Sequence, residues 1–170
     1  MYLRRTYRRY VEALTGGHRV APDDFLDFEA FRLRMAWADW VRSFSWDAWC
    51  TPTCENPVTE RRARLLVMRW LRRQGRQAYA AVIYERTPGA LLVHPHALVG
   101  GLHRTAPKHP TPLAVTHLRE SWPHGNIKVE PYYAGMDRPG TYRGASWYLV
   151  KTGVDGVTIV GQPVRWRPSR

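Results

Sequence analysis

Two histidines, His94 and His96, lie two residues apart inside the apolar run 91–101. Side chains at positions i and i+2 of a strand point to the same face of a sheet. The run therefore predicts a strand over 90–99 that presents both imidazoles side by side, and the two glycines that follow let the chain leave the sheet. Two imidazoles from one strand can hold a divalent metal ion if a third ligand comes from a neighbouring segment.

The candidate third ligand is Glu85, near the end of a predicted strand over 79–86 that a short turn joins to the histidine strand. Opposed residues of an antiparallel pair share a face. Glu85 reaches the histidine face if it lies opposite His94, or opposite Leu92 and diagonal to His94, whereas a slip of one residue turns it to the other face. The metal hypothesis is therefore also a prediction of register. The alternative is a pair of core or edge histidines with ordinary hydrogen bonds.

Two imidazoles and one carboxylate leave coordination positions open, which suits Mg, Mn, Co or Zn, with Mn or Mg preferred for phosphoryl chemistry. Such an ion would polarise a scissile phosphate and stabilise charge on its oxygens. A purely structural metal is disfavoured because three ligands leave the site open.

A tyrosine and a lysine, Tyr148 and Lys151, lie three residues apart in a predicted helix over 143–152, so they share a face of that helix. A phenol has a pKa near 10 and is a weak nucleophile at neutral pH. A nearby metal ion and the lysine cation would both favour the phenolate. The alternative is a tyrosine that simply packs beside Trp147, and Tyr142 stays open as the true nucleophile or a second one.

The charge balance points to a polyanionic partner. The 170-residue chain has 26 Lys and Arg against 14 Asp and Glu, a net charge of +12. Such a field attracts nucleic acid through phosphate neutralisation and counterion release. Eight tryptophans and nine tyrosines also suit base stacking, although most large aromatic residues in a domain of this size belong to the core. The alternative is a solvated basic surface.

No run of 18 apolar residues exists, so no membrane span is expected, and the basic N-terminus has no apolar core behind it as a secretory signal would. A cytoplasmic location follows as the expectation. Cys50 and Cys54 are expected to be reduced and inert. Four further histidines, with no spacing that singles them out, are expected to be solvated or to contact phosphate: His103, His109, His117 and His124.

The remaining patterns predict an α+β domain with an antiparallel sheet and helices on one or both faces. Helices are predicted over 2–14, from 22 to about 43, over 60–73 with Thr59 as its cap, and, short or irregular, over 113–122. Further strands are predicted over 46–54 and 126–132, and a small hairpin over 154–166. Residues 1–45 are then an N-terminal helical extension packed on a core of residues 46–170, as one structural domain.

These residues together resemble the HUH endonuclease superfamily, in its single-tyrosine, rolling-circle replication initiator branch. The run from His94 to Gly101 is similar to the family's metal-binding strand, Glu85 to its acidic ligand, and Tyr148-Leu149-Val150-Lys151 to its tyrosine motif. Segments 49–54 and 125–131 resemble its first motif and the strand before its tyrosine helix. Pro52, Cys54 and Pro95 depart from the family's pattern. A proline fits poorly in a central strand, so local distortion or an edge position is expected at Pro95.

The resemblance implies a HUH-type central antiparallel sheet, similar to those of ferredoxin and RRM domains. It implies site-specific nicking and joining of single-stranded DNA, which initiates rolling-circle replication of a plasmid or phage. Tyr148 would attack a phosphate with the help of Lys151 and form a 5′-phosphotyrosine link. Glu85, His94 and His96 would hold Mn or Mg.

The implied partners are single-stranded DNA or hairpin origin DNA, together with a host helicase and polymerase, since no helicase domain has a counterpart here. The arginine-rich helices would hold the DNA backbone. The predicted DNA-binding residues are Arg86, Arg104, Lys108, Lys128 and Arg143.

Two alternatives remain open. A single-tyrosine transposase or a relaxase would use the same chemistry for another purpose. A non-catalytic single-strand nucleic-acid-binding module on the same ferredoxin-like sheet would need no divalent ion and would form no covalent adduct.

Overall fold

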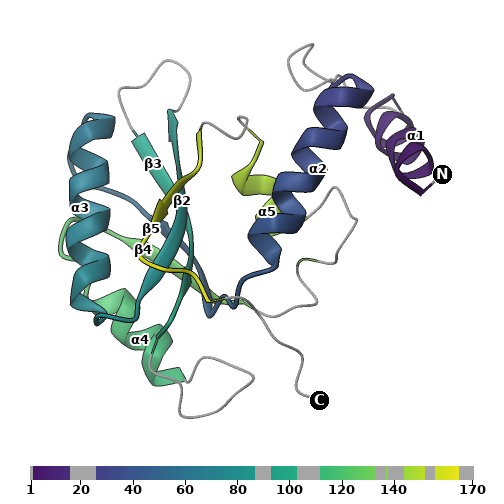
Figure 1. The fold of residues 1–170 in the computed structure, drawn as a ribbon. Coiled ribbons are helices and arrows are strands. Elements are labelled where there is room, and N and C mark those ends of the chain that lie inside the picture. Colours follow the sequence, from purple (N-terminus) through teal and green to yellow (C-terminus); the bar gives the residue numbers. More distant parts are fainter. Residues whose placement is uncertain are drawn as a thin grey trace, which may run out of the picture.

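The chain folds around one five-stranded antiparallel sheet with the strand order β4-β1-β3-β2-β5 (Figure 1), which confirms the predicted α+β class. The computed structural model describes residues 2–15, 26–86, 93–102, 112–132, 137, 144–151 and 156–164. The elements are α1 (Tyr2–Thr15), α2 (Phe28–Arg42), β1 (Ala48–Pro52), α3 (Glu60–Arg73), β2 (Tyr79–Arg86), β3 (Val93–Gly100), α4 (Pro112–Glu120), β4 (Ile127–Pro131), α5 (Ala145–Leu149) and β5 (Thr158–Val160). No helix in these ranges is long and apolar enough to cross a membrane.

The central part of the fold is a β1-α3-β2-β3-α4-β4 unit, which is the order of a ferredoxin-like domain. Strand β3 lies between β1 and β2 and pairs antiparallel with both. Strand β4 extends the sheet beyond β1, and β5 extends it beyond β2. The ferredoxin-like sheet that the resemblance implied is therefore present.

Helices cover both faces of the sheet (Figure 1). Helices α3 and α4 cover one face, where Leu66, Val67 and Trp70 of α3 belong to a buried cluster with alternate residues of the strands. Helices α2 and α5 cover the other face, where Val41 and Leu149 pack with residues of β2 and β3. Because side chains alternate along a strand, β1, β2, β3 and β5 each supply residues to both clusters, whereas β4 supplies them to the α3 side alone.

Local sequence determines where α3 begins and which side of it is buried. The Thr59 side chain accepts a hydrogen bond from the backbone N–H of Arg62 at 3.3 Å and caps the helix. The buried residues recur at helical spacing, namely Ala63, Leu66, Val67, Trp70 and Leu71. The structure confirms the predicted bounds of α3 and of β2.

Several other predicted elements have different bounds in the structure. Helix α2 begins at Phe28 rather than near residue 22, because Asp27 caps it by accepting a hydrogen bond from the backbone N–H of Ala30 at 2.8 Å. Strand β1 is shorter at both ends than the predicted 46–54, and α5 is shorter than the predicted 143–152. Residues 143 and 152 themselves lie outside the described ranges.

The predicted hairpin over 154–166 is wrong in its described part, 156–164. That part holds one strand, β5, which pairs with β2 through Ala80 opposite Val160 and Val82 opposite Thr158. Gly161, with a φ of 81°, follows the strand directly. The chain then continues to Val164, whose carbonyl accepts a hydrogen bond from Ser45 rather than from a second hairpin strand.

Pro95 lies in the central strand β3, opposite Tyr84 of β2. The pairing of β3 with β1 ends at Cys50 opposite Ala97, so β3 has no paired β1 residue at Pro95. The missing N–H of proline therefore costs no ladder hydrogen bond on that side. Pro95 is therefore paired on one side only, as in an edge strand, although β3 itself lies in the middle of the sheet.

Candidate active site

The register of β2 and β3 places the three predicted ligands on one face of the sheet. Glu85 lies directly opposite His94, and Ile83 lies opposite His96. This is one of the two registers that bring the carboxylate to the histidine face, so the register prediction is confirmed. Helix α5 packs on this face.

Tyr148 of α5 directs its hydroxyl at this cluster. Its Oη donates a hydrogen bond to Oε2 of Glu85 at 2.8 Å and lies 3.4 Å from Nε2 of His96. Tyr148 and Glu85 are 63 residues apart in the sequence. The fold therefore brings together the predicted nucleophile and two of the predicted ligands.

Lys151 follows α5 and completes the network. Its Nζ forms an ion pair with Oε1 of Glu85 and lies 3.9 Å from the centre of the Tyr148 ring. Nε2 of His96 lies 3.1 Å from Oε2 of Glu85, and Nδ1 of His96 lies 3.3 Å from Oγ1 of Thr51. One carboxylate is thus in contact with a phenol, an ammonium group and an imidazole.

The aromatic ring of Trp49 lies beside this network. The Trp49 ring stacks on His96 with centres 5.8 Å apart and meets Tyr148 edge-on at 5.6 Å. A cavity of about 400 Å³ opens here, lined by Trp49, Thr51, His96, Glu130, Gly144, Ala145 and Tyr148. A ligand in this cavity would reach both the phenol and an aromatic surface.

The surroundings keep Tyr148 protonated at neutral pH. Burial raises the pKa of the phenol above its ordinary value; the hydrogen bond with Lys151 lowers it, but the Glu85 carboxylate raises it again. Lys151 thus acts in the expected direction, but burial and Glu85 outweigh it. The cation therefore favours the phenolate as expected, but it does not bring the pKa of Tyr148 below its ordinary value. Tyr148 therefore needs a base.

Two groups beside the phenol can accept its proton. Burial alone would raise the pKa of Glu85, but hydrogen bonds from Lys151 and Tyr148 hold it below its ordinary value, so the carboxylate is ionised. Burial lowers the pKa of His96 below 6.5, although the Glu85 charge opposes this, so its imidazole is neutral at pH 7. Burial also opposes the charge of Lys151, but its contacts with Glu85 raise its pKa, so it stays a cation.

The predicted metal ligands Glu85, His94 and His96 share one face of the sheet. The oxygens of Glu85 contact Lys151, Tyr148 and His96. Within the described ranges, no group of three His, Cys, Asp or Glu side chains is placed to hold a metal ion. In this arrangement an ammonium group lies where a cation would meet the carboxylate.

Two of the predicted DNA-binding residues lie in the described part of the chain. Lys128 of β4 lies opposite Thr51 and forms an ion pair of 3.1 Å with Glu130, which lines the cavity. Arg86 ends β2, is exposed, and lies 3.8 Å from Glu60. Outside the described residues lie Arg104, Lys108, Arg143 and the alternative nucleophile Tyr142.

The cysteines are free, and burial raises the pKa of both thiols. Neither thiol is a thiolate at neutral pH, which agrees with the expectation that they are inert.

Sequence reasoning missed three residues that shape this site. Trp49 and Thr51 are two residues apart on β1, so both share one face, and both contact His96. The predicted strand over 46–54 contains this alternation, but the sequence did not show that β1 pairs with β3. Asp137 accepts a hydrogen bond from the backbone N–H of Ser146 at 2.7 Å and so holds the first turn of α5. Asp137 belongs to no sequence motif, so no sequence signal distinguishes it.

Comparisons with protein-family models, with curated proteins and with solved structures found no match to this chain. The functional argument therefore rests on the residues and on their geometry.

Proposed function

We propose that this chain nicks and rejoins single-stranded DNA, with Tyr148 as the nucleophile that attacks a backbone phosphate. One observation carries the proposal: the Tyr148 hydroxyl lies 2.8 Å from the Glu85 carboxylate and 3.4 Å from the His96 imidazole. A nucleophile within reach of a base, with a cation beside it, is the arrangement that covalent catalysis requires. The HUH-like motif order and the basic surface support the same proposal.

In the proposed reaction, Glu85 orients the phenol and His96 removes its proton. The imidazole of His96 is assigned as the base because it is neutral and its ordinary pKa lies above that of a carboxyl group. Oη of Tyr148 forms a bond to phosphorus while the bond from phosphorus to the 3′ oxygen breaks. The departing 3′ oxygen takes a proton, and Lys151 offsets negative charge on the phosphate.

The proposed product is a 5′-phosphotyrosine link and a free 3′ hydroxyl. One phosphoester replaces another, so the strand can be rejoined when a 3′ hydroxyl attacks the link. That hydroxyl can also prime DNA synthesis, which is how the proposed initiation of rolling-circle replication would use a host helicase and polymerase. The substrate would be single-stranded or hairpin origin DNA.

The resemblance also implies Mn or Mg held by Glu85, His94 and His96, which would polarise the phosphate when bound. No step above depends on this ion, because Lys151 occupies the position beside Glu85.

The test is incubation with end-labelled single-stranded oligonucleotides, with Mn, with Mg and with a chelator, followed by a denaturing gel. A shifted, protease-sensitive band is expected from the unaltered protein and from Tyr84→Phe, a matched control on the other face of β2. The band is expected to vanish in Tyr148→Phe. If it persists there, the nucleophile is Tyr142 or another tyrosine.

A transposase or a relaxase would give the same band and would differ only in the DNA it selects. A non-catalytic single-strand binding module is favoured by one observation, the Trp49 ring beside the cavity, which could stack on a base. Tight binding of the oligonucleotide by the unaltered protein without any covalent band would select that function.

A further inference from the structure

Helix α3 carries six arginines and one glutamate. Three of the exposed arginines are Arg62, Arg69 and Arg73. Arg69 lies seven residues and Arg73 eleven residues after Arg62. At 3.6 residues per turn, these positions fall within about 20° of one line along the helix. We call these three residues the α3 stripe.

The α3 stripe is an uncompensated line of positive charge. The single acid of the helix, Glu60, pairs with Arg64 at 2.8 Å and lies 3.8 Å from Arg86. In the part of the chain that the structure describes, no ion pair involves a residue of the stripe. Its charges are therefore available to a ligand.

The positive charges of the stripe all act on one imidazole, that of His124. Burial and then the positive charges of Arg62, Arg73 and Arg69 lower the pKa of His124. This shared effect agrees with the helical spacing that puts the three arginines along one line. One acid, Glu55, lies beside His124, because its backbone N–H donates a hydrogen bond to the carbonyl of His124 at 2.8 Å.

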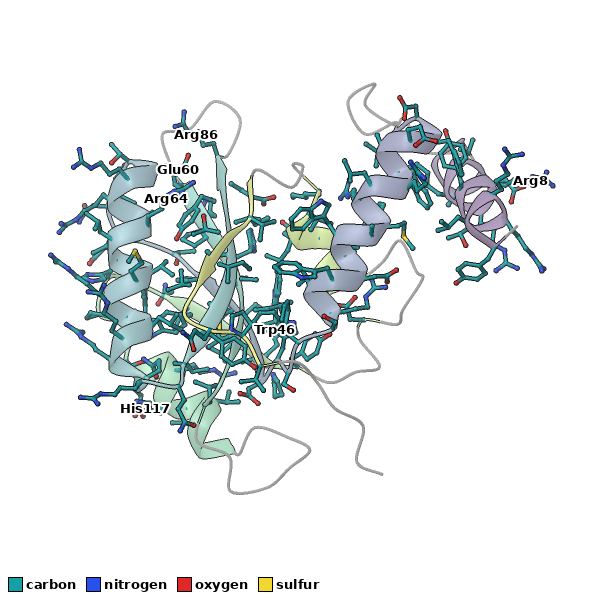
Figure 2. All side chains as sticks on the ribbon, viewed as in Figure 1. Arg8, Trp46, Glu60, Arg64, Arg86 and His117 are labelled. Carbon is teal, nitrogen blue, oxygen red and sulfur yellow. The ribbon has the colours of Figure 1, made fainter. Side chains whose placement is uncertain are left out.

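The stripe lies away from the proposed nucleophile. Helix α3 covers the sheet face opposite the one that α5 covers (Figure 1). Figure 2 shows nitrogen-tipped side chains that project outward along α3, far from Arg8 on α1. A ligand of the stripe is therefore not the strand segment that Tyr148 would attack.

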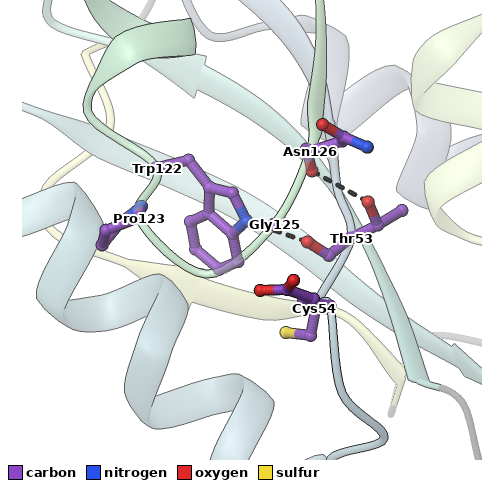
Figure 3. A pocket seen from close by; sticks show the side chains of 7 residues that line it. Thr53, Cys54, Trp122, Pro123, Gly125 and Asn126 are labelled. Atoms are coloured by element: carbon purple, nitrogen blue, oxygen red, sulfur yellow. Dashed lines mark hydrogen bonds between the residues drawn. The ribbon is translucent and has the colours of Figure 1, made fainter.

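The two tryptophans near the stripe do not expose their rings for base stacking. Trp70 is 1% exposed and Trp122 is 4% exposed. Trp122 donates its indole N–H to the carbonyl of Thr53 at 3.0 Å, at the wall of a cavity of about 410 Å³ (Figure 3). Glu55 also lines this cavity, and its carboxylate disfavours a phosphate there. Single-strand binding usually combines cations with exposed aromatic platforms, whereas the tryptophans at this surface are buried.

We propose that the α3 stripe binds the phosphate backbone of double-stranded DNA. Duplex DNA presents phosphates outward and keeps its bases stacked, so it needs cations and no aromatic platform. From Arg62 to Arg73 the helix rises about 16 Å. Three guanidinium groups spread over this length can each contact a separate phosphate, which gives three phosphate contacts. This function is additional to strand nicking and does not depend on it.

The experiment measures how the affinity for a labelled 5′-tagged duplex changes with salt between about 50 and 200 mM. The stripe variant carries Arg62→Gln, Arg69→Gln and Arg73→Gln. The matched control carries Arg4→Gln, Arg5→Gln and Arg8→Gln on α1, which are also exposed and remove the same charge. Thermal unfolding of both variants checks that they remain folded.

The stripe variant is expected to lose about 2.7 from the slope of log affinity against log salt, which corresponds to three phosphate contacts. The α1 control is expected to keep its slope. Equal losses in both variants would show that only the summed charge matters, and no loss in the stripe variant would also overturn the proposal. The proposal would also be overturned if the unaltered protein did not bind duplex DNA, or if it bound anionic lipid vesicles through the stripe instead.

Tyr148→Phe is expected to keep the full duplex slope. A failure of strand nicking and a failure of duplex binding are therefore separate results.

Discussion

At the scale of single residues, the Glu85 carboxylate connects the proposed nucleophile to a cation. One oxygen pairs with Lys151, and the other accepts a hydrogen bond from the Tyr148 hydroxyl and contacts His96. Any divalent ion that uses Glu85 must compete with the ammonium group. The metal requirement of this site and the position of Lys151 are therefore linked.

Lys151→Ala is expected to raise the affinity for Mn²⁺ by about tenfold or more, because it removes a like charge within a few ångströms of the ligand oxygens. Titration calorimetry measures this affinity. Lys128→Ala removes a lysine that pairs with Glu130 instead and is expected to leave Mn²⁺ binding unchanged. Glu85→Gln should abolish the binding. An unchanged affinity in Lys151→Ala would argue that Glu85 is not a ligand.

Tyr84 illustrates a buried polar group with a measurable cost. Its hydroxyl is buried without a hydrogen-bond partner among the described residues, and the ring lies 5.1 Å from the Arg64 guanidinium. An unsatisfied buried hydroxyl costs about 1–3 kcal/mol. Tyr84→Phe is therefore expected to leave the free energy of unfolding unchanged or to raise it by about 1 kcal/mol.

The same residue predicts an alkaline effect on stability. Burial raises the pKa of Tyr84 from 10.0 to about 12. As the pH rises, the unfolded chain loses this proton before the folded chain does. The free energy of unfolding is therefore unaffected by this group below pH 10 and falls as the pH rises from 10 towards 12. Urea unfolding at about pH 8 and about pH 11 measures the effect. Tyr84→Phe should reduce the loss at alkaline pH, and an identical loss in the variant would contradict this account.

At the scale of elements, the five-residue helix α5 depends on contacts outside itself. Asp137 accepts hydrogen bonds from the Ser146 backbone at 2.7 Å and from the Tyr132 hydroxyl at 3.2 Å. It also lies 3.2 Å from the guanidinium of Arg42 on α2. A helix this short is not stable alone. Asp137 therefore determines where α5 holds Tyr148.

Asp137→Ala is expected to lower the free energy of unfolding by about 3–5 kcal/mol, because it leaves Arg42 buried without its buried partner. Covalent adduct formation should fall more than oligonucleotide binding does, since the phenol loses its position. Asp39→Ala removes the other, more exposed partner of Arg42 and should cost about 1 kcal/mol or less. Chemical unfolding and the adduct gel measure the two effects. Equal losses in both variants would contradict a positioning role.

Local signals explain which elements the sequence predicts well. Thr59 with the apolar spacing behind it predicted both ends of α3, and the turn between β2 and β3 restricted their register to pairings that could be tested. The hairpin prediction failed because β5 finds its partner in β2, a distant strand that no local pattern identifies. Asp137 was missed for the same reason, since its partners are set by tertiary packing.

At the scale of the whole molecule, a net charge of +12 remains after all 170 residues are counted. Like charges that lie close together destabilise a compact fold, and salt screens them. The melting temperature is therefore expected to rise as sodium chloride increases from about 20 to about 500 mM. The rise should be smaller in the stripe variant, which has fewer repelling groups on α3. Calorimetry checks this, and a fall with salt would show that attractive ion pairs dominate.

The order of the site residues along the chain has a consequence for protein synthesis. Trp49, Glu85 and His96 emerge from the ribosome well before Tyr148, because translation proceeds from the N-terminus. A nascent chain that stops after β4 would already contain the four strands of the ferredoxin-like unit, but not the proposed attacking group. An interrupted translation product would therefore lack the means to break a strand, however firmly it held one.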